Sequence, residues 1–197
     1  EITMLDTANA LVSLTDTKTF LKILDASEDA LLESMINRAS AFVNDYTQRL
    51  LLSRVNTEYY DGDGTNTLIL KQYPVTSITI NDDVDRKFLP ATELDVTNNV
   101  IVDSANGIIR LWNNEFAFDK GTLNVKVVYT AGYILANVPA SIQEAVMLYV
   151  GNAYRSQYLH QRFGRTSDRT GDASYTYSNE EIMTQIKNLL NPHRSES

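Results

Sequence analysis

The chain has 197 residues, of which 43% are hydrophobic and 21% charged, a composition that fits a globular protein with a buried core and excludes a mainly disordered chain, a coiled coil and a collagen-like repeat. Its formal net charge is −8, with 11 basic and 20 acidic side chains up to residue 150 and 6 basic and 5 acidic after it, so it lacks the basic footprint of proteins that grip DNA. It has no cysteine, which excludes disulfides, thiolate metal sites and cysteine nucleophiles.

The first 50 residues predict two helices. Thr15 can cap a short first helix, with Asp16 favourably placed at its positive end. Ser27 opens the second helix, in which apolar residues recur at steps of three and four between Leu31 and Tyr46. This spacing predicts a strong amphipathic helix that ends between residues 47 and 50.

After residue 54 the spacing of apolar residues changes from the period of about 3.6 typical of a helix to the period of two typical of a strand. Residues 55–60, 67–71 and 75–80 are rich in β-forming residues and predict three strands. The Asp-Gly-Asp-Gly sequence at 61–64 has the composition of a turn, so we expect residues 67–71 to return beside residues 55–60 as a hairpin.

Residues 82–121 have a weaker pattern. Short strands are predicted at 89–96, 100–102 and 108–112, with Asn98-Asn99 and Asn106-Gly107 as hairpin turns. Beyond this region, Leu123, Val125 and Val127 alternate with polar residues, which is typical of a half-buried strand.

The last third of the chain predicts two further helices. Pro139 suits the first turn of a long helix whose apolar residues run from Ile142 to Tyr154. Residues 160–177 are polar and rich in arginine, glycine and serine, so we expect a mobile loop. Ser178 then caps a short helix with a capping box, and its apolar stripe is formed by Ile182, Ile186, Leu189 and Leu190.

Together these elements predict an α+β fold. We expect a small helical bundle with a β-rich subdomain inserted between its second and third long helices, and a C-terminal arm with a short helix. The expected boundaries are residues 1–54 and 135–159 for the helical body, 55–134 for the β subdomain with an insertion at 82–121, and 160–197 for a flexible arm.

The sequence carries no motif for catalysis or for a cofactor. A phosphate-binding P-loop, a GxSxG nucleophile elbow and an HExxH zinc motif are all missing. His160 and His193 lie in polar segments and are expected to be exposed, and Asp61 and Asp63 lack the spacing of a calcium loop. We therefore predict no enzyme and no catalytic, cofactor or metal site, although a carboxylate pair for hydrolysis stays open among 25 acidic residues.

The tyrosines near the C-terminus have two possible roles. Tyr149 and Tyr154 fall on the apolar side of the long helix and are expected to pack in the core. Tyr158, Tyr175 and Tyr177 could equally pack or contact a protein partner, because tyrosine is enriched at interface hot spots.

Six segments occur in an order that resembles the head–tail connector (adaptor) proteins of long-tailed bacteriophages. The resemblance covers most of the chain and is weakest over residues 82–121, and it depends on order and spacing rather than on any single motif. The terminal leucine–proline–aromatic–arginine pattern of that family is matched except that His193 stands where an aromatic residue is usual. The segments are residues 14–24, 29–49, 59–78, 125–133, 138–157 and 186–194.

The resemblance implies a structural protein of the virion neck, assembled in the host cytoplasm. It implies a ring of about twelve subunits beneath the portal protein that extends the DNA channel and receives the next neck or tail protein. DNA would pass through the ring without specific binding. No contact with a membrane is implied, since no apolar run approaches the ~20 residues that cross a bilayer.

Two residue sets follow from this resemblance as expectations. The arm is expected to bind the portal through Tyr175, Tyr177, Ile182, Ile186, Leu189, Leu190, His193 and Arg194, with the stripe of the short helix covered by a partner or a neighbouring subunit. Acids that could line the channel are Asp25, Glu28, Asp29 and Glu33.

Two other functions remain open at this stage. One is a β-rich adhesion or carbohydrate-binding module, which would show an exposed aromatic platform around Trp112 and Phe116. The other is a carboxylate-dependent hydrolase, which would show a concave pocket containing an acid of raised pKa.

Overall fold

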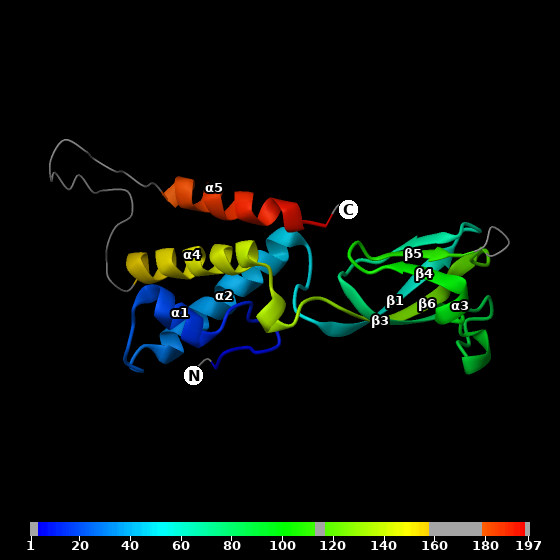
Figure 1. Cartoon of the computed structure of the whole chain (residues 1–197), viewed down its shortest axis with the longest axis horizontal. Helices are drawn as coiled ribbons and strands as arrows, with labels where there is room; N and C mark the ends of the chain where they lie inside the picture. Colours follow the sequence, from blue (N-terminus) through cyan, green and yellow to red (C-terminus); the bar gives the residue numbers. More distant parts are fainter. Residues whose placement is uncertain (1–3, 113–116, 158–178, 196–197) are drawn as a thin grey trace. The chain divides into compact units, whose positions relative to one another are not determined.

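The computed structural model describes residues 4–112, 117–157 and 179–195. The chain forms two compact units, a helical unit made of Glu1–Leu52 and Leu135–Ser197 and a β unit made of Ser53–Ile134 (Figure 1). The strands are inserted between the two longest helices, so the predicted α+β class is confirmed. Within the described ranges, no helix has the length and apolarity needed to cross a bilayer.

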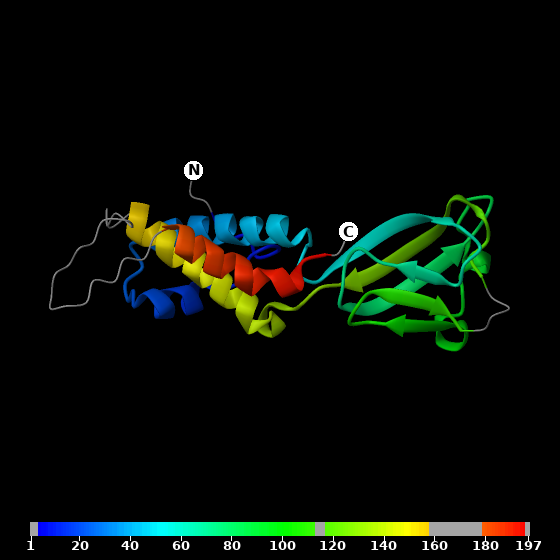
Figure 2. The same cartoon turned by 90° about the horizontal axis from the view of Figure 1, so that it is seen from above.

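The helical unit contains α1 (Leu14–Leu21), α2 (Asp29–Thr47), α4 (Ala140–Gln157) and α5 (Asn179–Leu190). Helix α4 contacts both α2 and α5, and α1 packs against α2 and α4 (Figure 2). Short 3₁₀ turns at Leu135–Asn137 and Asn191–His193 precede α4 and follow α5. The apolar residues that gave the helical period form the core between these helices, namely Leu32, Met35, Ile36, Ala39, Val43, Ile142, Ala145, Val146 and Val150.

Helix α1 approaches α4 closely because α4 has a glycine at the crossing. A Cβ atom on Gly151 would lie 3.3 Å from Cε1 of Phe20 and 3.7 Å from Cδ2 of Leu21. A larger side chain at this position would push α1 away, which is why a small residue is placed there.

Two helix starts differ from the sequence prediction. Helix α1 is capped by Ser13 and not by Thr15, since the Ser13 hydroxyl accepts a hydrogen bond from the Asp16 amide at 3.0 Å. Helix α2 is not capped by Ser27, because the amide of Ser27 donates to the Asp25 carboxylate at 2.9 Å and its hydroxyl also bonds to that carboxylate. Ser27 therefore belongs to a turn that ends just before the helix.

The β unit consists of two three-stranded antiparallel sheets. The first has the order β1 (Arg54–Gly62), β6 (Gly121–Ala131), β3 (Val75–Asp82), and the second has the order β2 (Thr67–Ile69), β5 (Ile108–Leu111), β4 (Val100–Asp103). The two sheets pack face to face, because one cluster of buried residues contains members of both. The cluster is formed by Leu68, Leu70, Val75, Ile80, Ile109, Leu111, Phe118, Val125, Val127, Tyr129 and Ala131.

The predicted hairpin between residues 55–60 and 67–71 is wrong. β1 pairs with β6, in a register that places Tyr59 opposite Lys126, and β2 pairs with β5 in the other sheet. β6 is 11 residues long and has four fully buried side chains near its end, so it takes the centre of its sheet, where both of its edges are hydrogen-bonded.

The predicted strand at 89–96 is also wrong. Pro90–Thr92 forms a 3₁₀ turn, and the short helix α3 (Val96–Asn99) follows it, capped by the Asp95 carboxylate, which accepts from the amides of Thr97 and Asn98. Asn98-Asn99 therefore ends a helix and is not a hairpin turn. The turn predicted at Asn106-Gly107 does join β4 to β5, with Gly107 at a φ of +68°.

Candidate interaction surfaces

Helix α5 packs onto the rest of the helical unit. Ile186 and Leu190 are fully buried there, where α5 contacts α4 and α2, while Ile182 and Leu189 are half-buried. The helix also has favourable charges, with two glutamates in its first turn and Lys187 in its last. The expectation that the whole apolar stripe needs a partner is therefore wrong for Ile186 and Leu190, which their own chain covers.

The tail after α5, residues 191–195, is hydrogen-bonded to the C-terminal end of α2. The Tyr46 hydroxyl donates to Oδ1 of Asn191 at 2.7 Å, and the Ser195 amide donates to the Thr47 carbonyl at 2.9 Å. The guanidinium of Arg194 lies 5.3 Å from the centre of the Tyr46 ring, within range of a cation–π interaction. These contacts join residues about 145 positions apart in the sequence.

Arg49 contacts the tail at His193. Arg49 is 3% exposed, and its Nη1 donates to the His193 carbonyl at 3.3 Å. The His193 ring nitrogen Nε2 is 2.8 Å from the Ser141 hydroxyl at the start of α4. His193 is therefore half-buried and bonded, not exposed as the sequence suggested, and burial together with the charge of Arg49 lowers its pKa.

This environment predicts a pH dependence of the helical unit. The pKa of His193 is lower in the folded than in the unfolded chain. As the pH falls through the pKa of histidine in the unfolded chain, the unfolded chain therefore binds more protons than the folded chain, and acidification lowers the free energy of unfolding. We expect urea unfolding between about pH 7 and about pH 5 to show a smaller loss of stability for His193→Gln than for the wild type. An equal loss in both proteins would show that His193 does not contribute.

Other predicted residues cannot be placed. Tyr158, His160, Tyr175 and Tyr177 lie outside the described residues, as does the predicted cap Ser178. The same holds for Phe116, whereas its expected companion Trp112 is 71% exposed at the end of β5.

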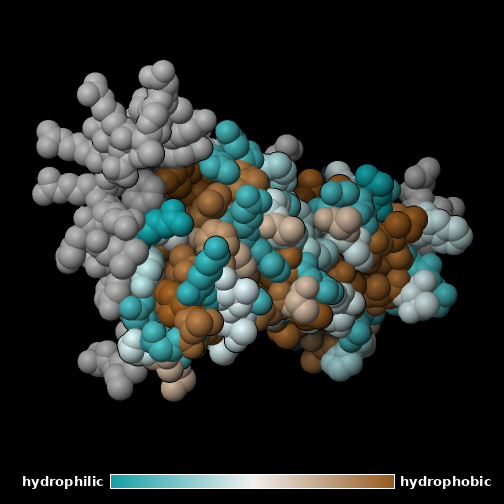
Figure 3. Space-filling model, turned by 60° about the vertical axis from the view of Figure 1, so that its left-hand side comes forward, coloured by the Kyte–Doolittle hydropathy of each residue, from teal (hydrophilic) through white to brown (hydrophobic). Residues whose placement is uncertain are grey.

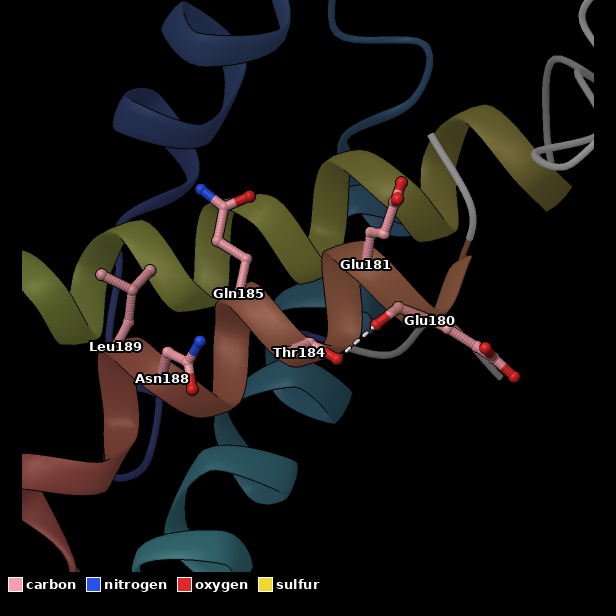
Figure 4. A pocket seen from close by; sticks show the side chains of 6 residues that line it. All are labelled: Glu180, Glu181, Thr184, Gln185, Asn188 and Leu189. Carbon is pink, nitrogen blue, oxygen red and sulfur yellow. Dashed lines mark hydrogen bonds between the residues drawn. The ribbon is translucent and has the colours of Figure 1, made fainter. Parts of the chain in front are cut away.

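The outward side of α5 forms a shallow hollow (Figure 4). The Thr184 hydroxyl donates back to the Glu180 carbonyl at 2.7 Å, as threonine does inside a helix. The lining is polar except for one leucine. The residues are Glu180, Glu181, Thr184, Gln185, Asn188 and Leu189.

A second, more apolar groove runs between α1 and α4. Leu11, Val12, Leu135 and Met147 line it, and Phe20 stands at its edge with 47% of its surface exposed. Figure 3 shows that apolar side chains gather at several places on the surface, each bordered by hydrophilic ones.

The four candidate channel acids differ in their surroundings. Nζ of Lys18 forms a salt bridge with Oδ1 of Asp29 at 2.6 Å, and the Tyr154 hydroxyl bonds to Glu28. Glu33 is half-buried, and Asp25 is exposed, with hydrogen bonds from Ser27 that hold its pKa below the usual range. Two of the four acids, Asp29 and Glu28, are thus paired within the helical unit.

The acidic turns of the β unit are held by their own backbone contacts. Oδ1 of Asp61 accepts from the Leu123 amide at 2.7 Å, and Oδ1 of Asp63 accepts from the Thr65 amide at 2.8 Å. Across the ranges that the structure describes, no group of three or more histidine, aspartate or glutamate side chains could hold a metal ion. These carboxylates therefore stabilise turns.

Comparison with known proteins gives one family and several solved structures of similar fold. A family model described as Head completion protein matches residues 10–195. Three solved chains are similar over 100% of this chain. One comes from the neck of an empty gene transfer agent particle computed with C6 symmetry, with a TM-score of 0.62, 19% identity and 95% of that chain covered. The second, from the virion of the native particle, has a TM-score of 0.60, 17% identity and 95% coverage, and the third, from the neck of the native particle computed with C12 symmetry, has a TM-score of 0.58, 17% identity and 94% coverage. At these identities the likeness shows a shared fold. No curated protein matches the chain.

Proposed function

Because the chain belongs to the head completion protein family and is a structural head–tail connector protein of a virion neck, we propose that it forms a ring beneath the portal protein, extends the DNA channel and receives the next neck or tail protein. The observation that carries this proposal is the family match from residue 10 to residue 195, which covers the β unit and nearly all of the helical unit, including the tail after α5.

The proposed ring has about twelve copies, related by rotation and meeting through two different surfaces of each copy. Support comes from the similar chain in the neck of the native gene transfer agent particle computed with C12 symmetry. The groove between α1 and α4 and the flanks of α2 and α4 are the surfaces of the helical unit that we expect to meet the neighbouring copies.

The proposed portal-binding surface is the outward side of α5 with the tail. Ile182, Leu189 and Arg194 are accessible there, while Ile186 and Leu190 hold the helix in place from its buried side. Tyr175, Tyr177 and His193 stay part of the proposal, His193 through its contact with Ser141, which positions the tail.

The ring hypothesis can be tested by removing the protein from particle assembly. Particles made without this chain are expected to accumulate as DNA-filled heads without tails, and added wild-type protein should restore complete particles. Native mass measurement of isolated necks should then give about twelve copies. A single copy or a twofold dimer in the neck would contradict the proposed ring.

The channel hypothesis predicts an effect of charge on DNA movement. An acidic wall repels DNA and lets it slide, so replacing acids with lysine creates sites where phosphates are held. We expect Asp25→Lys combined with Glu33→Lys to slow DNA release from triggered particles, and to slow it less at high salt. Glu93→Lys combined with Asp119→Lys makes the same charge change on exposed positions of the β unit and serves as the control. Equal rates for wild type and variant would contradict a role of these acids in the channel.

A further inference from the structure

The turn between β4 and β5 contains a chemically labile pair of residues. Asn106 is followed by Gly107, and no other asparagine of the chain precedes a glycine. An asparagine before glycine loses its side-chain amide without an enzyme more readily than other asparagines, because glycine has no Cβ atom to hinder attack by its backbone nitrogen. Asn106 is exposed, so water can reach it.

Deamidation requires two groups to approach each other. The Gly107 nitrogen loses its proton and attacks the side-chain carbonyl carbon of Asn106, which forms a cyclic imide and releases the side-chain amide nitrogen as ammonia. Water then opens the imide at either carbonyl and leaves aspartate or isoaspartate in place of Asn106. The Gly107 nitrogen and the Asn106 side chain must therefore both be free to move.

Asp103 holds both of these groups in the folded chain. Its backbone carbonyl accepts a hydrogen bond from the Gly107 amide at 2.9 Å, and its Oδ2 accepts one from Nδ2 of Asn106 at 2.9 Å. Oδ1 of Asp103 also accepts from the Asn106 amide at 3.3 Å. The hydrogen bond from the Asn106 side chain lowers the pKa of Asp103, so at neutral pH this carboxylate is ionised and acts only as an acceptor.

Gly107 is also fixed from its other side. Its carbonyl accepts a hydrogen bond from the Leu70 amide at 2.8 Å, and the residue is buried. A Cβ atom built on Gly107 would lie 3.4 Å from the Leu70 carbonyl oxygen. Movement of the Gly107 nitrogen toward the Asn106 side chain therefore requires the turn to separate from the segment that follows β2.

We propose that Asn106 is a deamidation site which Asp103, as a positioning residue, keeps protected in the folded chain, so that the reaction occurs only when the β4–β5 turn opens. Either product would add a negative charge beside Asp103. Isoaspartate would also lengthen the backbone of a turn whose span is set by the pairing of Asp103 with Ile108. This role concerns the β unit alone and is independent of the proposed ring.

Rates of deamidation in the folded and the unfolded chain test this role. The full chain is kept in warm, mildly alkaline buffer with or without concentrated guanidinium chloride, and trypsin then releases residues 88–110. Liquid chromatography with mass spectrometry separates the asparagine, aspartate and isoaspartate forms at residue 106, with Asn98 and Asn99 of the same peptide as references. We expect residue 106 of the folded wild type to react at least about tenfold more slowly than in denaturant, because the reaction waits for local opening.

Substitutions of Asp103 separate its role from that of the fold. Asp103→Ala removes both side-chain contacts and should raise the folded-state rate about threefold to tenfold, as expected for the loss of hydrogen bonds that keep the turn closed, with no change in denaturant. Asp103→Ser keeps a hydroxyl that can accept from the Asn106 amide but is too short to hold Nδ2 as well, so its rate should fall between those of wild type and Asp103→Ala.

Asp63→Ala is the matched control. It removes another carboxylate that forms a turn in the β unit, where Oδ1 of Asp63 accepts from the Thr65 amide at 2.8 Å. Since Thr67 pairs with Arg110 and Ile69 with Ile108, Asp63 lies toward the end of β5 that is away from Asn106. This variant should deamidate at residue 106 as slowly as the wild type.

Three results would overturn the proposed protection. Equal wild-type rates in buffer and in denaturant would show that the folded turn does not protect Asn106. A folded-state rate of Asp103→Ala equal to that of the wild type would remove Asp103 from this role. Equal increases in Asp103→Ala and Asp63→Ala would assign the effect to general loosening of the β unit. If Asp103→Ala does not fold, the same comparisons are decided by Asp103→Ser.

Discussion

Replacing Leu190 with alanine is expected to lower the free energy of unfolding of the helical unit by about 3 kcal/mol, within the usual range for a buried leucine. The Leu190 side chain is fully buried between α5 and the rest of the unit, so its removal leaves a cavity that the tail contacts keep from collapsing. Urea unfolding followed by far-ultraviolet circular dichroism measures the change.

Leu24→Ala provides a matched control in the same unit. Leu24 is 98% exposed, and the same substitution there is expected to change the free energy of unfolding by less than about 0.5 kcal/mol. If Leu190→Ala were as mild as Leu24→Ala, α5 would be detached in the free protein, as the sequence alone suggested for the arm.

Adding negative charge to the outward side of α5 is expected to weaken attachment to DNA-filled heads by at least about tenfold, since like charges that meet in an interface cost several kcal/mol. The change is Gln185→Glu with Lys187→Glu, both at exposed positions, and it alters the net charge by −3. This prediction assumes that the docking face of the portal is acidic, as the resemblance to connector proteins implies, so that the variant would bring like charges together in the proposed contact. Binding is measured by sedimentation of the protein with purified heads at several salt concentrations.

Lys71→Glu with Ala91→Glu makes the same charge change on exposed positions of the β unit. This control should bind heads nearly as well as the wild type, and all three proteins should unfold at similar urea concentrations. Unchanged binding by the α5 variant would remove α5 from the proposed portal contact. Point substitutions serve better here than deletion of the arm, because deletion would also remove the buried Ile186 and Leu190.

The long helices could be predicted from the sequence nearly to the residue, because each buries a continuous apolar stripe that repeats every three or four positions. The helix predicted to open at Ser27 and to end between residues 47 and 50 corresponds to Asp29–Thr47, and the helix expected from Pro139 corresponds to Ala140–Gln157. Strand positions were similarly clear where burial alternates, as in β6. The pairing of the strands could not be predicted in this way, because it depends on which strand has enough buried side chains to take the centre of a sheet.

The interaction surfaces were harder to predict for a related reason. The apolar stripe of α5 was visible in the sequence, but a stripe does not say whether its own chain or another chain covers it. The role of Arg49 was missed, since its partner His193 is 144 positions away. A basic residue just after an amphipathic helix was the signal available, and such residues more often stay in solvent.

The β unit enters and leaves the helical unit at almost one point. The amide of Ser53 donates to the carbonyl of Tyr133 at 2.9 Å, and Arg54 pairs with Ala131, so the two ends of the inserted segment lie side by side. A short glycine-containing loop could therefore bridge residues 52 and 135 in place of the whole insert. We expect the helices that flank the β unit to keep their own packing after such a replacement, which makes this junction a suitable site for exchanging domains in protein engineering.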